Sequence, residues 1–512
     1  SRSTPAQKLR EKLEQVAIPE GTEPSGYQLT LPGIDNEVKR LISAPGEPDR
    51  PQHAGGRDAY PCRVALGSLI VQSILGLSDR GTARIIQESP YIQYFLGFEE
   101  WSAQNTVHPS SLVYFRKRLG LEAMKELNEL YINESRHGKA YLNDAHATVA
   151  PQDANTAGAA PDANIPGATQ EDNTPGNLPD TQASGEPQHA GTPGSAQDAG
   201  SQGAPQDEPA SANAGTLILD ATCGPVYIRY PQDFSLLNEA RRGTDVILSS
   251  LCKRMGLEKP RTNPITIQKE AQRLSKTKKK QEEQIRHVIR LELNAIKRNL
   301  DYLEGFVQQG ASLTMKEAGY IQTVRTLYAQ QRYMYENHTH TVRDRIVSVF
   351  MPFIRPINRG KVDRPTEFGP KFDLGVDKEG FSRIVHFSFQ NYNESTHLEE
   401  AAEAYREQNG HYPACIEADQ IYRTRGNLAF CKKRGIRLSG PPLGRKPASE
   451  EKLKAQEKLE KQDLTERIEV ERHFSREKRC FGLDPIMKRT PQTIEHTVGM
   501  AVYLDNIVPT GF

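Results

Sequence analysis

Hydrophobic residues recur with two different periods along the chain, and these periods predict where helices and strands form. Between residues 60 and 138 the apolar positions follow the spacing of amphipathic helices, with Ser78 and either Ser110 or Ser111 placed as N-caps. Short apolar runs bounded by turn residues predict strands at 217–220, 345–351, 381–389, 415–419 and 436–438. Helical spacing returns at 395–408, at 424–434 and around residue 471. The pattern predicts an α/β fold preceded by a separate all-α domain.

The same pattern divides the chain into six segments. We expect an N-terminal arm over residues 1–58, a helical domain over 59–142 and a linker over 143–214. A catalytic domain follows in two parts, 215–262 and 345–512, separated by a long helical insertion over 263–344. The linker almost lacks large apolar side chains, so it cannot bury enough surface to offset its ordering entropy. We therefore expect the linker to be disordered.

The net charge of +1 conceals a strong asymmetry. Residues 141–213 contain ten acidic residues and no Lys or Arg, whereas residues 251–300 contain 14 basic and 5 acidic residues. Four of these basic residues cluster at a predicted helix break: Lys276, Lys278, Lys279 and Lys280. An excess of this size is an electrostatic footprint for a polyanion. A solvated helix face would explain it equally well.

Candidate catalytic residues stand at the ends of two predicted strands and on one helix. Asp220 and Asp419 each end an apolar run, where a sheet opens to solvent. At about 100° per residue, Arg467, Glu471 and Lys478 lie within about 40° of one another on a helix, so one stripe presents all three. Three carboxylates brought close together raise one another's pKa unless cations offset their charge, so the three acids indicate a metal site. The order of the elements is that of the ribonuclease H-like fold, a mixed sheet with helices on both faces.

The helix predicted at residues 109–119 is a second candidate surface. We expect Phe115 to point inward and Arg116, Lys117 and Arg118 to lie close to solvent, as in the second helix of a helix-turn-helix unit that contacts DNA. An ordinary surface helix that ends in basic residues is the alternative.

Two further acids lie near the predicted site. We expect Glu417 to point to the sheet face opposite Asp419, in a structural role. Glu394 follows a predicted strand in Tyr392-Asn393-Glu394, and it is a candidate for a fourth acid.

These residues belong to motifs that resemble bacterial insertion-sequence transposases of the DDE class. The similarity includes a Tyr-x2-Arg-x3-Glu-x6-Lys type signature, formed here by Arg467, Glu471 and Lys478. One departure is Leu464, which stands where the signature has its tyrosine. Residues 60–120 are similar to the helical N-terminal domain of the same transposases. Further matching motifs are Asp220-Ala221-Thr222, Tyr230-Pro231-Gln232-Asp233, Glu367-Phe368-Gly369, Tyr392-Asn393-Glu394, residues 418–425 and 435–441, Lys478-Arg479 and Phe481-Gly482-Leu483.

The resemblance implies that Asp220, Asp419 and Glu471 hold two Mg²⁺ ions, for which Mn²⁺ would substitute. It also implies that the chain binds terminal inverted repeats and cuts and rejoins DNA. The partners would be double-stranded DNA, as transposon ends and target, and further copies of the chain in a homodimer or larger assembly. For Arg467, an ion pair with Glu471 one turn away is the alternative to DNA contact. The residues expected to contact DNA are Arg116, Lys117, Arg118, Lys276, Lys278, Lys279, Lys280, Arg467, Lys478 and Arg479.

Two other functions stay open, namely an inactive or domesticated transposase that binds DNA without cutting it, and a stand-alone ribonuclease H-like nuclease. The longest apolar stretch is too short to cross a bilayer and the N-terminal region lacks the apolar core of a signal peptide. We therefore expect no membrane partner and a cytoplasmic, nucleoid-associated protein. Six scattered cysteines without a Cys-x2-Cys pair argue against a disulfide framework and a zinc ribbon.

Overall fold

The computed structural model describes residues 60–147 except Glu99 and Asn105, and residues 212–358, 366–441 and 450–508. The expected N-terminal arm and residues 148–211 of the expected linker lie outside the described residues. Residues 143–147, which we assigned to the linker, instead continue the helix α7 (Leu121–Ala147).

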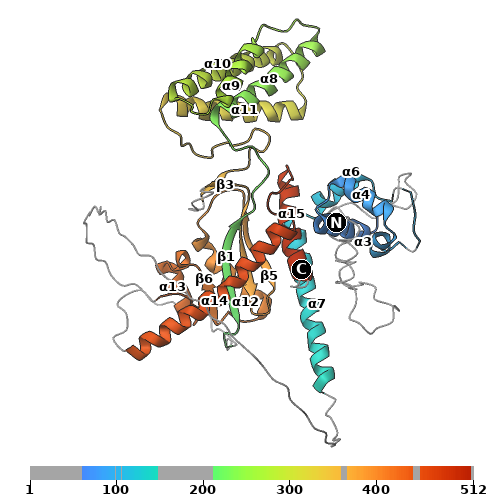
Figure 1. The fold of residues 1–512 in the computed structure, drawn as a ribbon, viewed down its shortest axis with the longest axis vertical. Helices are drawn as coiled ribbons and strands as arrows, with labels where there is room; N and C mark the ends of the chain where they lie inside the picture. Colours follow the sequence, from blue (N-terminus) through green and yellow to red (C-terminus); the bar gives the residue numbers. More distant parts are fainter. Residues whose placement is uncertain are drawn as a thin grey trace, which may run out of the picture. The chain divides into compact units, whose positions relative to one another are not determined.

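A mixed five-stranded sheet forms the centre of the α/β part (Figure 1). Its strand order is β5-β4-β1-β6-β7. The central strand β1 pairs antiparallel with β4 and parallel with β6. β5 joins β4 in antiparallel orientation, and β7 joins β6 in parallel orientation. The strands span Thr216–Cys223 (β1), Lys371–Asp377 (β4), Ser382–Ser388 (β5), Cys415–Ala418 (β6) and Arg437–Leu438 (β7), and a separate pair joins β2 (Pro356–Asn358) to β3 (Thr366–Phe368).

Helices cover both faces of this sheet because the strands are apolar on both sides. Leu217 and Leu219 of β1 face α12 (Leu398–Asn409) and α13 (Arg425–Lys433) in one hydrophobic cluster. Ile218 of β1 belongs to the opposite cluster, with α14 (Glu450–Cys480) and α15 (Pro491–Ile507). The ring of Phe372 on β4 meets that of Phe474 on α14, with centroids 6.3 Å apart. The expected mixed sheet with helices on both faces is thus present.

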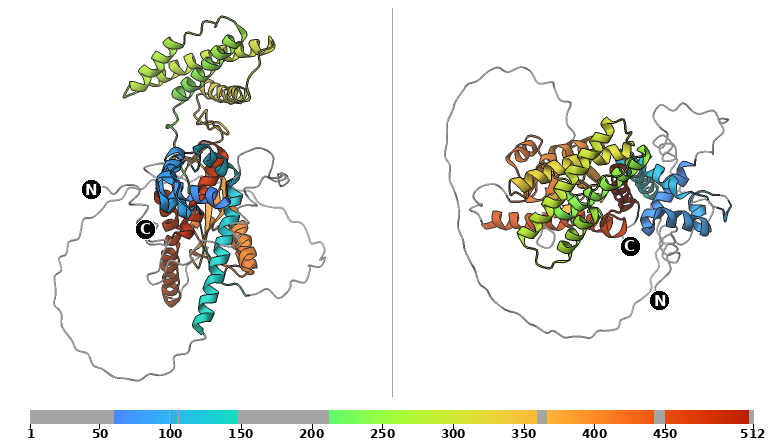
Figure 2. Two further views of the ribbon diagram at one scale, coloured as in Figure 1. Left: turned by 90° about the vertical axis from the view of Figure 1, so that its right-hand side faces the viewer. Right: turned by 90° about the horizontal axis from the view of Figure 1, so that it is seen from above.

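Four helices between β1 and β2 form a helical cluster with its own core (Figures 1 and 2). Arg241 of α8 lies in this core and donates hydrogen bonds to Glu292 of α10 at 2.8 Å and to Asp245 at 2.9 Å. α8 packs with this cluster, so the helical part begins upstream of the boundary that we expected at residue 263. The helices are α8 (Asp233–Met255), α9 (Pro264–Lys276), α10 (Glu282–Gln308) and α11 (Met315–Glu336).

The N-terminal helices share one hydrophobic cluster with α15 and the sheet, so the expectation of a separate domain is wrong. Asn128 of α7 donates to the carbonyl of Ser382 on β5 at 2.9 Å, and Leu119 accepts a bond from buried His496 of α15 at 2.6 Å. Ser78 caps α4 as expected, whereas α6 is capped by His108 and not by a serine. The helices before α7 are α3 (Cys62–Leu75), α4 (Asp79–Glu88), α5 (Pro90–Phe95) and α6 (Pro109–Arg118).

The sequence predicted one strand that does not form and did not predict one strand that does, because local sequence does not show which segments pair. Residues 345–351 form no strand, although Ile346, Val347 and Val349 are buried. The fully buried strand β4 was not predicted, because its Asp373 and Gly375 interrupt the apolar run. α15 was not predicted either. The expected strands at 381–389 and 436–438 are confirmed as β5 and β7.

No single described helix is long and apolar enough to span a bilayer, and the pair α3 and α4, which bends by 107° at its break, meets that criterion only when taken together.

Candidate active site

Asp220 and Asp419 lie on neighbouring parallel strands at matching positions. The register pairs Leu219 of β1 with Ala418 of β6. Asp220 is the next residue after Leu219, and Asp419 is the next residue after Ala418. Asp419 lies one residue beyond the end of its strand, β6, and its carboxylate accepts a bond from the amide of Gln420 at 2.6 Å. Asp220 does not end a strand, because β1 continues to Cys223. The two acids are nevertheless brought side by side.

The helix α14 crosses these strands (Figure 1), and two side-chain contacts hold it there. Arg467 lies 3.2 Å from a carboxylate oxygen of Asp419, and Lys478 donates to the hydroxyl of Thr222 at 2.9 Å. Glu471 lies between these anchor residues on the same helix and on the same stripe. Because Thr222 lies two residues beyond Asp220, the segment of α14 that carries Glu471 passes over the pair of aspartates. Arg467 thus pairs with Asp419 and not, as in the alternative, with Glu471.

The three carboxylates of the candidate site do not converge on one point. Within the described part of the chain, three ligand atoms of His, Cys, Asp or Glu approach within 4.8 Å of one another only in the group His386, His397 and Glu400. Asp220, Asp419 and Glu471 therefore do not form so close a group. Mutual repulsion opposes their approach, and positive charge is needed to offset it. Arg467 supplies part of that charge at Asp419.

Two buried residues near the site were not predicted from the sequence, namely Tyr422, which lies close to the charges of Asp220 and Asp419, and Asp373, which lies close to Tyr422. The hydroxyl of Tyr422 is buried and has no hydrogen-bond partner among the described residues. Burial raises the pKa of Tyr422, and so do the nearby charges of Asp373, Asp220, Glu394 and Asp419. Burial also raises the pKa of Asp373 to about 7. Asp373 could not be found because its strand was not predicted, whereas Tyr422 belongs to the motif that follows Asp419.

Of the two neighbouring acids, Glu417 lies on a different face of the sheet than we expected, and Glu394 has an ion-pair partner. Glu417 lies two residues before Asp419, and alternation along a strand therefore places both on the same face, contrary to our expectation. Glu417 is buried against Glu466 of α14, and burial followed by this contact raises its pKa to about 8. Glu394 forms an ion pair with Lys371, which neutralises it beside the site.

The expected basic residues differ in exposure. Arg116 is only 3% exposed, so the expectation that it lies close to solvent is wrong. Its guanidinium donates to Gln72 and to Asp79, each at 2.7 Å, and joins α6 to α3 and α4. Lys117 and Arg118 are exposed, as is Arg479 at the end of α14. At the end of α9 and in the break after it, Lys276, Lys278 and Lys279 are exposed, and Lys280 is partly buried and donates to the carbonyl of Thr277 at 3.0 Å.

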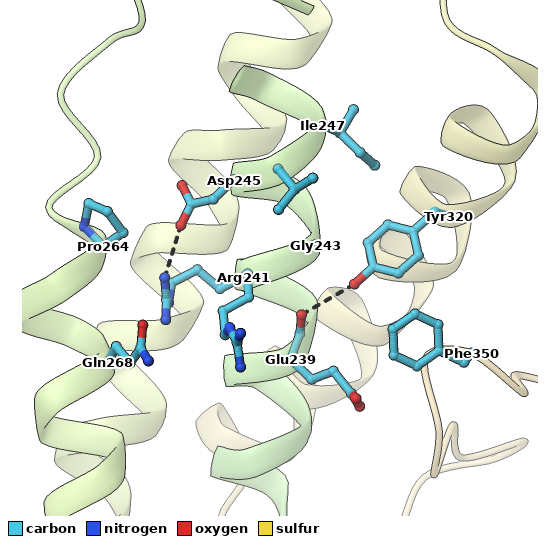
Figure 3. A pocket seen from close by; sticks show the side chains of 11 residues that line it. Glu239, Arg241, Gly243, Asp245, Ile247, Pro264, Gln268, Tyr320 and Phe350 are labelled. Atoms are coloured by element: carbon cyan, nitrogen blue, oxygen red, sulfur yellow. Dashed lines mark hydrogen bonds and ion pairs between the residues drawn. The ribbon is translucent and has the colours of Figure 1, made fainter. Parts of the chain in front are cut away.

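A hollow of about 570 Å³ lies within the helical cluster (Figure 3). Tyr320 crosses one side of it and donates to the backbone carbonyl of Glu239 at 3.2 Å. A Cβ atom on Gly243 would lie 2.0 Å from the Tyr320 hydroxyl, so this close approach requires glycine. None of the three acids lines this hollow, and no sequence motif pointed to it.

Known families match both ends of the chain. Residues 416–507 match a family model described as a transposase DDE domain, and residues 36–118 match one described as a transposase domain (DUF772). An uncharacterized protein, ORF8 in the nfe locus of Rhizobium meliloti, is 32% identical over 72 residues, which are 14% of this chain and 35% of that protein. The similarity thus spans about a third of that relative. No solved structure matches the chain significantly.

Proposed function

We propose that the chain is an insertion-sequence transposase of the DDE class, which cuts and joins DNA at transposon ends with a site formed by Asp220, Asp419 and Glu471. The matched DDE region contains Asp419 and Glu471, and Asp220 lies on the strand that pairs with β6.

The pairing of β1 with β6 is the observation that carries this proposal. It aligns two acids that are distant in sequence, and α14 crosses them between the Arg467 and Lys478 contacts. The sheet order supports a ribonuclease H-like catalytic domain, with three antiparallel strands followed outward from β1 by two parallel ones. In such an arrangement, acids from two neighbouring strands and from one helix would meet on one face of the sheet.

The donor set fits divalent cations that prefer oxygen ligands. Asp220, Asp419 and Glu471 offer only carboxylate oxygens, which suit Mg²⁺ and also Mn²⁺. The buried hydroxyl of Tyr422, which has no hydrogen-bond partner among the described residues, lies close to the charges of Asp220 and Asp419. Two such ions, when bound, activate a water or a 3′-hydroxyl and stabilise the departing 3′-oxygen of a phosphodiester.

The remaining residues of the site orient the acids and bind the DNA backbone. Arg467 holds the carboxylate of Asp419, and Lys478 ties α14 to β1. The exposed Arg479 and the Lys276 to Lys280 cluster would contact phosphates, as would Lys117 and Arg118 in the N-terminal helices. Acting on chromosomal DNA, the protein would work in the cytoplasm at the nucleoid, as a dimer or larger assembly on DNA.

Cleavage of DNA that carries the ends of the element tests this function. Asp220→Ala, Asp419→Ala and Glu471→Ala should each abolish Mg²⁺-dependent or Mn²⁺-dependent cleavage and leave binding of the ends largely intact. Glu469→Ala is the matched control, because Glu469 lies on the same helix and pairs with Arg472 instead. Cleavage by the Asp419→Ala chain at the rate of the parent would refute the site.

The same assay separates the alternatives. An inactive or domesticated transposase would bind the ends, and the unmodified chain would not cut them. A stand-alone ribonuclease H-like nuclease would cleave substrates that lack the transposon ends equally well.

A further inference from the structure

Two histidines and a glutamate meet on the face of the sheet opposite α14. His386 comes from β5, His397 from the 3₁₀ turn η1 (Glu394–His397) and Glu400 from the first turn of α12. One ligand atom from each residue lies within 4.8 Å of the other two. Nδ1 of His386 lies 3.5 Å from a carboxylate oxygen of Glu400. The imidazole rings of His386 and His397 stack with centroids 3.7 Å apart.

Asp373 orients the imidazole of His397. Its carboxylate lies 3.1 Å from Nδ1 of His397 and accepts a bond from the Tyr392 hydroxyl at 2.7 Å. A carboxylate that accepts the Nδ1 hydrogen leaves Nε2 with a free lone pair, which is the common arrangement behind metal-bound histidines. Asp373 is fully buried on β4, so this orientation is built into the sheet. Burial also lowers the pKa of both histidines and favours the neutral imidazoles that can act as ligands.

We propose that His386, His397 and Glu400 bind one Zn²⁺ ion, or a similar late first-row divalent cation, at a site separate from the three catalytic acids. Two imidazoles and one carboxylate form a donor set that favours such ions over Mg²⁺. Tetrahedral Zn²⁺ with ligands at about 2.0–2.2 Å holds its ligand atoms roughly 3.4 Å apart. Binding would therefore draw the three ligand atoms, which lie within 4.8 Å of one another, closer together, and would turn the two stacked imidazoles so that a ring nitrogen of each points at the ion. The side chain of Glu400 is 51% exposed, and this open side leaves room for a water as fourth ligand.

The ion would act as a clamp between three segments of the chain. It would join β5, η1 and the start of α12, and it would hold the turn that carries Glu394 against the sheet. Asp220, Asp419 and Glu471 are not ligands of this ion. Binding of Zn²⁺ here can therefore be measured whether or not the chain cleaves DNA.

Equilibrium dialysis of the full-length chain against Zn²⁺, with Mg²⁺ in excess to occupy oxygen-rich sites, tests the proposal. The parent should bind one Zn²⁺ more per chain than His397→Asn or Glu400→Gln. His287→Asn should bind as much as the parent, because His287 is an exposed histidine on α10 outside the group. Asp373→Asn should weaken the affinity about 10- to 100-fold, as expected for a residue that orients a ligand.

Thermal unfolding distinguishes a variant that has lost the metal site from one that no longer folds. Zn²⁺ should raise the Tm of the parent and of His287→Asn, but not that of Glu400→Gln, whose half-exposed position makes the substitution mild. Co²⁺ in place of Zn²⁺ should give the visible absorption of a tetrahedral site in the parent and in His287→Asn, but not in His397→Asn or Glu400→Gln. Equal Zn²⁺ binding by the parent, His397→Asn and Glu400→Gln, or an equal rise of Tm in all of them, would overturn the proposal.

Discussion

Lys478 of α14 donates a hydrogen bond to the hydroxyl of Thr222 on β1 at 2.9 Å, two residues beyond Asp220. Side chains two residues apart on a strand share a face, so this bond ties the helix that carries Glu471 to the face that carries Asp220. Lys478 therefore has a structural partner in addition to any phosphate that it contacts.

This bond predicts coupling between Lys478 and Thr222 in catalysis. Lys478→Met and Thr222→Val should each slow cleavage, between about 10- and 100-fold, because a shift of α14 misplaces Glu471. The double variant should be no slower than Lys478→Met alone, since both changes break one interaction. Rates of end cleavage for the four chains measure this coupling. A Thr222→Val chain with full activity beside an inactive Lys478→Met would mean that Lys478 acts on DNA and not through Thr222.

Arg116 is predicted to stabilise the N-terminal helices. Arg116→Ala should lower the free energy of unfolding by roughly 2–4 kcal/mol, because it leaves the buried amide of Gln72 and the partly buried Asp79 without their guanidinium partner. Lys117→Ala is the matched control, since Lys117 is exposed and should change stability by less than about 0.5 kcal/mol. Denaturant unfolding compares the two variants, and equal stabilities would contradict the structural role of Arg116.

The lysines between α9 and α10 are predicted to bind DNA through phosphates. Replacing Lys276, Lys278, Lys279 and Lys280 by Gln should make the negative slope of log affinity against log salt concentration shallower by about 0.9 for each lost contact. Lys297→Gln is a suitable control, because its ammonium already pairs with Asp301 at 2.7 Å. Titrations of labelled transposon ends at several salt concentrations give the slopes. If the quadruple variant keeps the slope of the parent, these lysines form only a solvated surface.

Two glycines of the helical cluster should respond in opposite directions to alanine. Gly243→Ala would place a methyl group against the ring of Tyr320 and should destabilise the protein by about 1–3 kcal/mol. Gly305→Ala meets no atom within 4 Å and lies inside α10, so it should stabilise the protein by up to about 1 kcal/mol. Thermal unfolding of both variants measures this difference. Stabilisation by Gly243→Ala would show that the close approach of Tyr320 is not needed.

Removal of divalent cations is predicted to stop cleavage without abolishing end binding. Asp220, Asp419 and Glu471 repel one another, and chelation removes the charge that offsets this repulsion. Adding Mg²⁺ or Mn²⁺ back should restore cleavage, as measured on the same labelled DNA. Full activity in excess chelator would contradict a metal-dependent mechanism.

Local sequence patterns were sufficient to predict the helices and strands whose conformation depends mainly on their own residues. The spacing of apolar positions predicted the helices at 395–408 and 424–434, which the structure has as η1 with α12 and as α13. The strand before Asp419 was likewise visible as an apolar run, and the helical stripe of Arg467, Glu471 and Lys478 follows from helix geometry. The motifs around these residues indicated the family that both family models match.

Pairing and burial, by contrast, are decided only when distant segments meet. β4 carries Asp373 and Gly375 within its apolar run, and it is a strand because β1 and β5 flank it. Arg116 looked like a surface residue because its partners, Gln72 and Asp79, lie 44 and 37 positions away. The group of His386, His397 and Glu400 likewise exists only because β5 packs beside η1 and α12. A one-dimensional pattern reports which face of an element is apolar, whereas the partner of each polar atom is set by the tertiary fold.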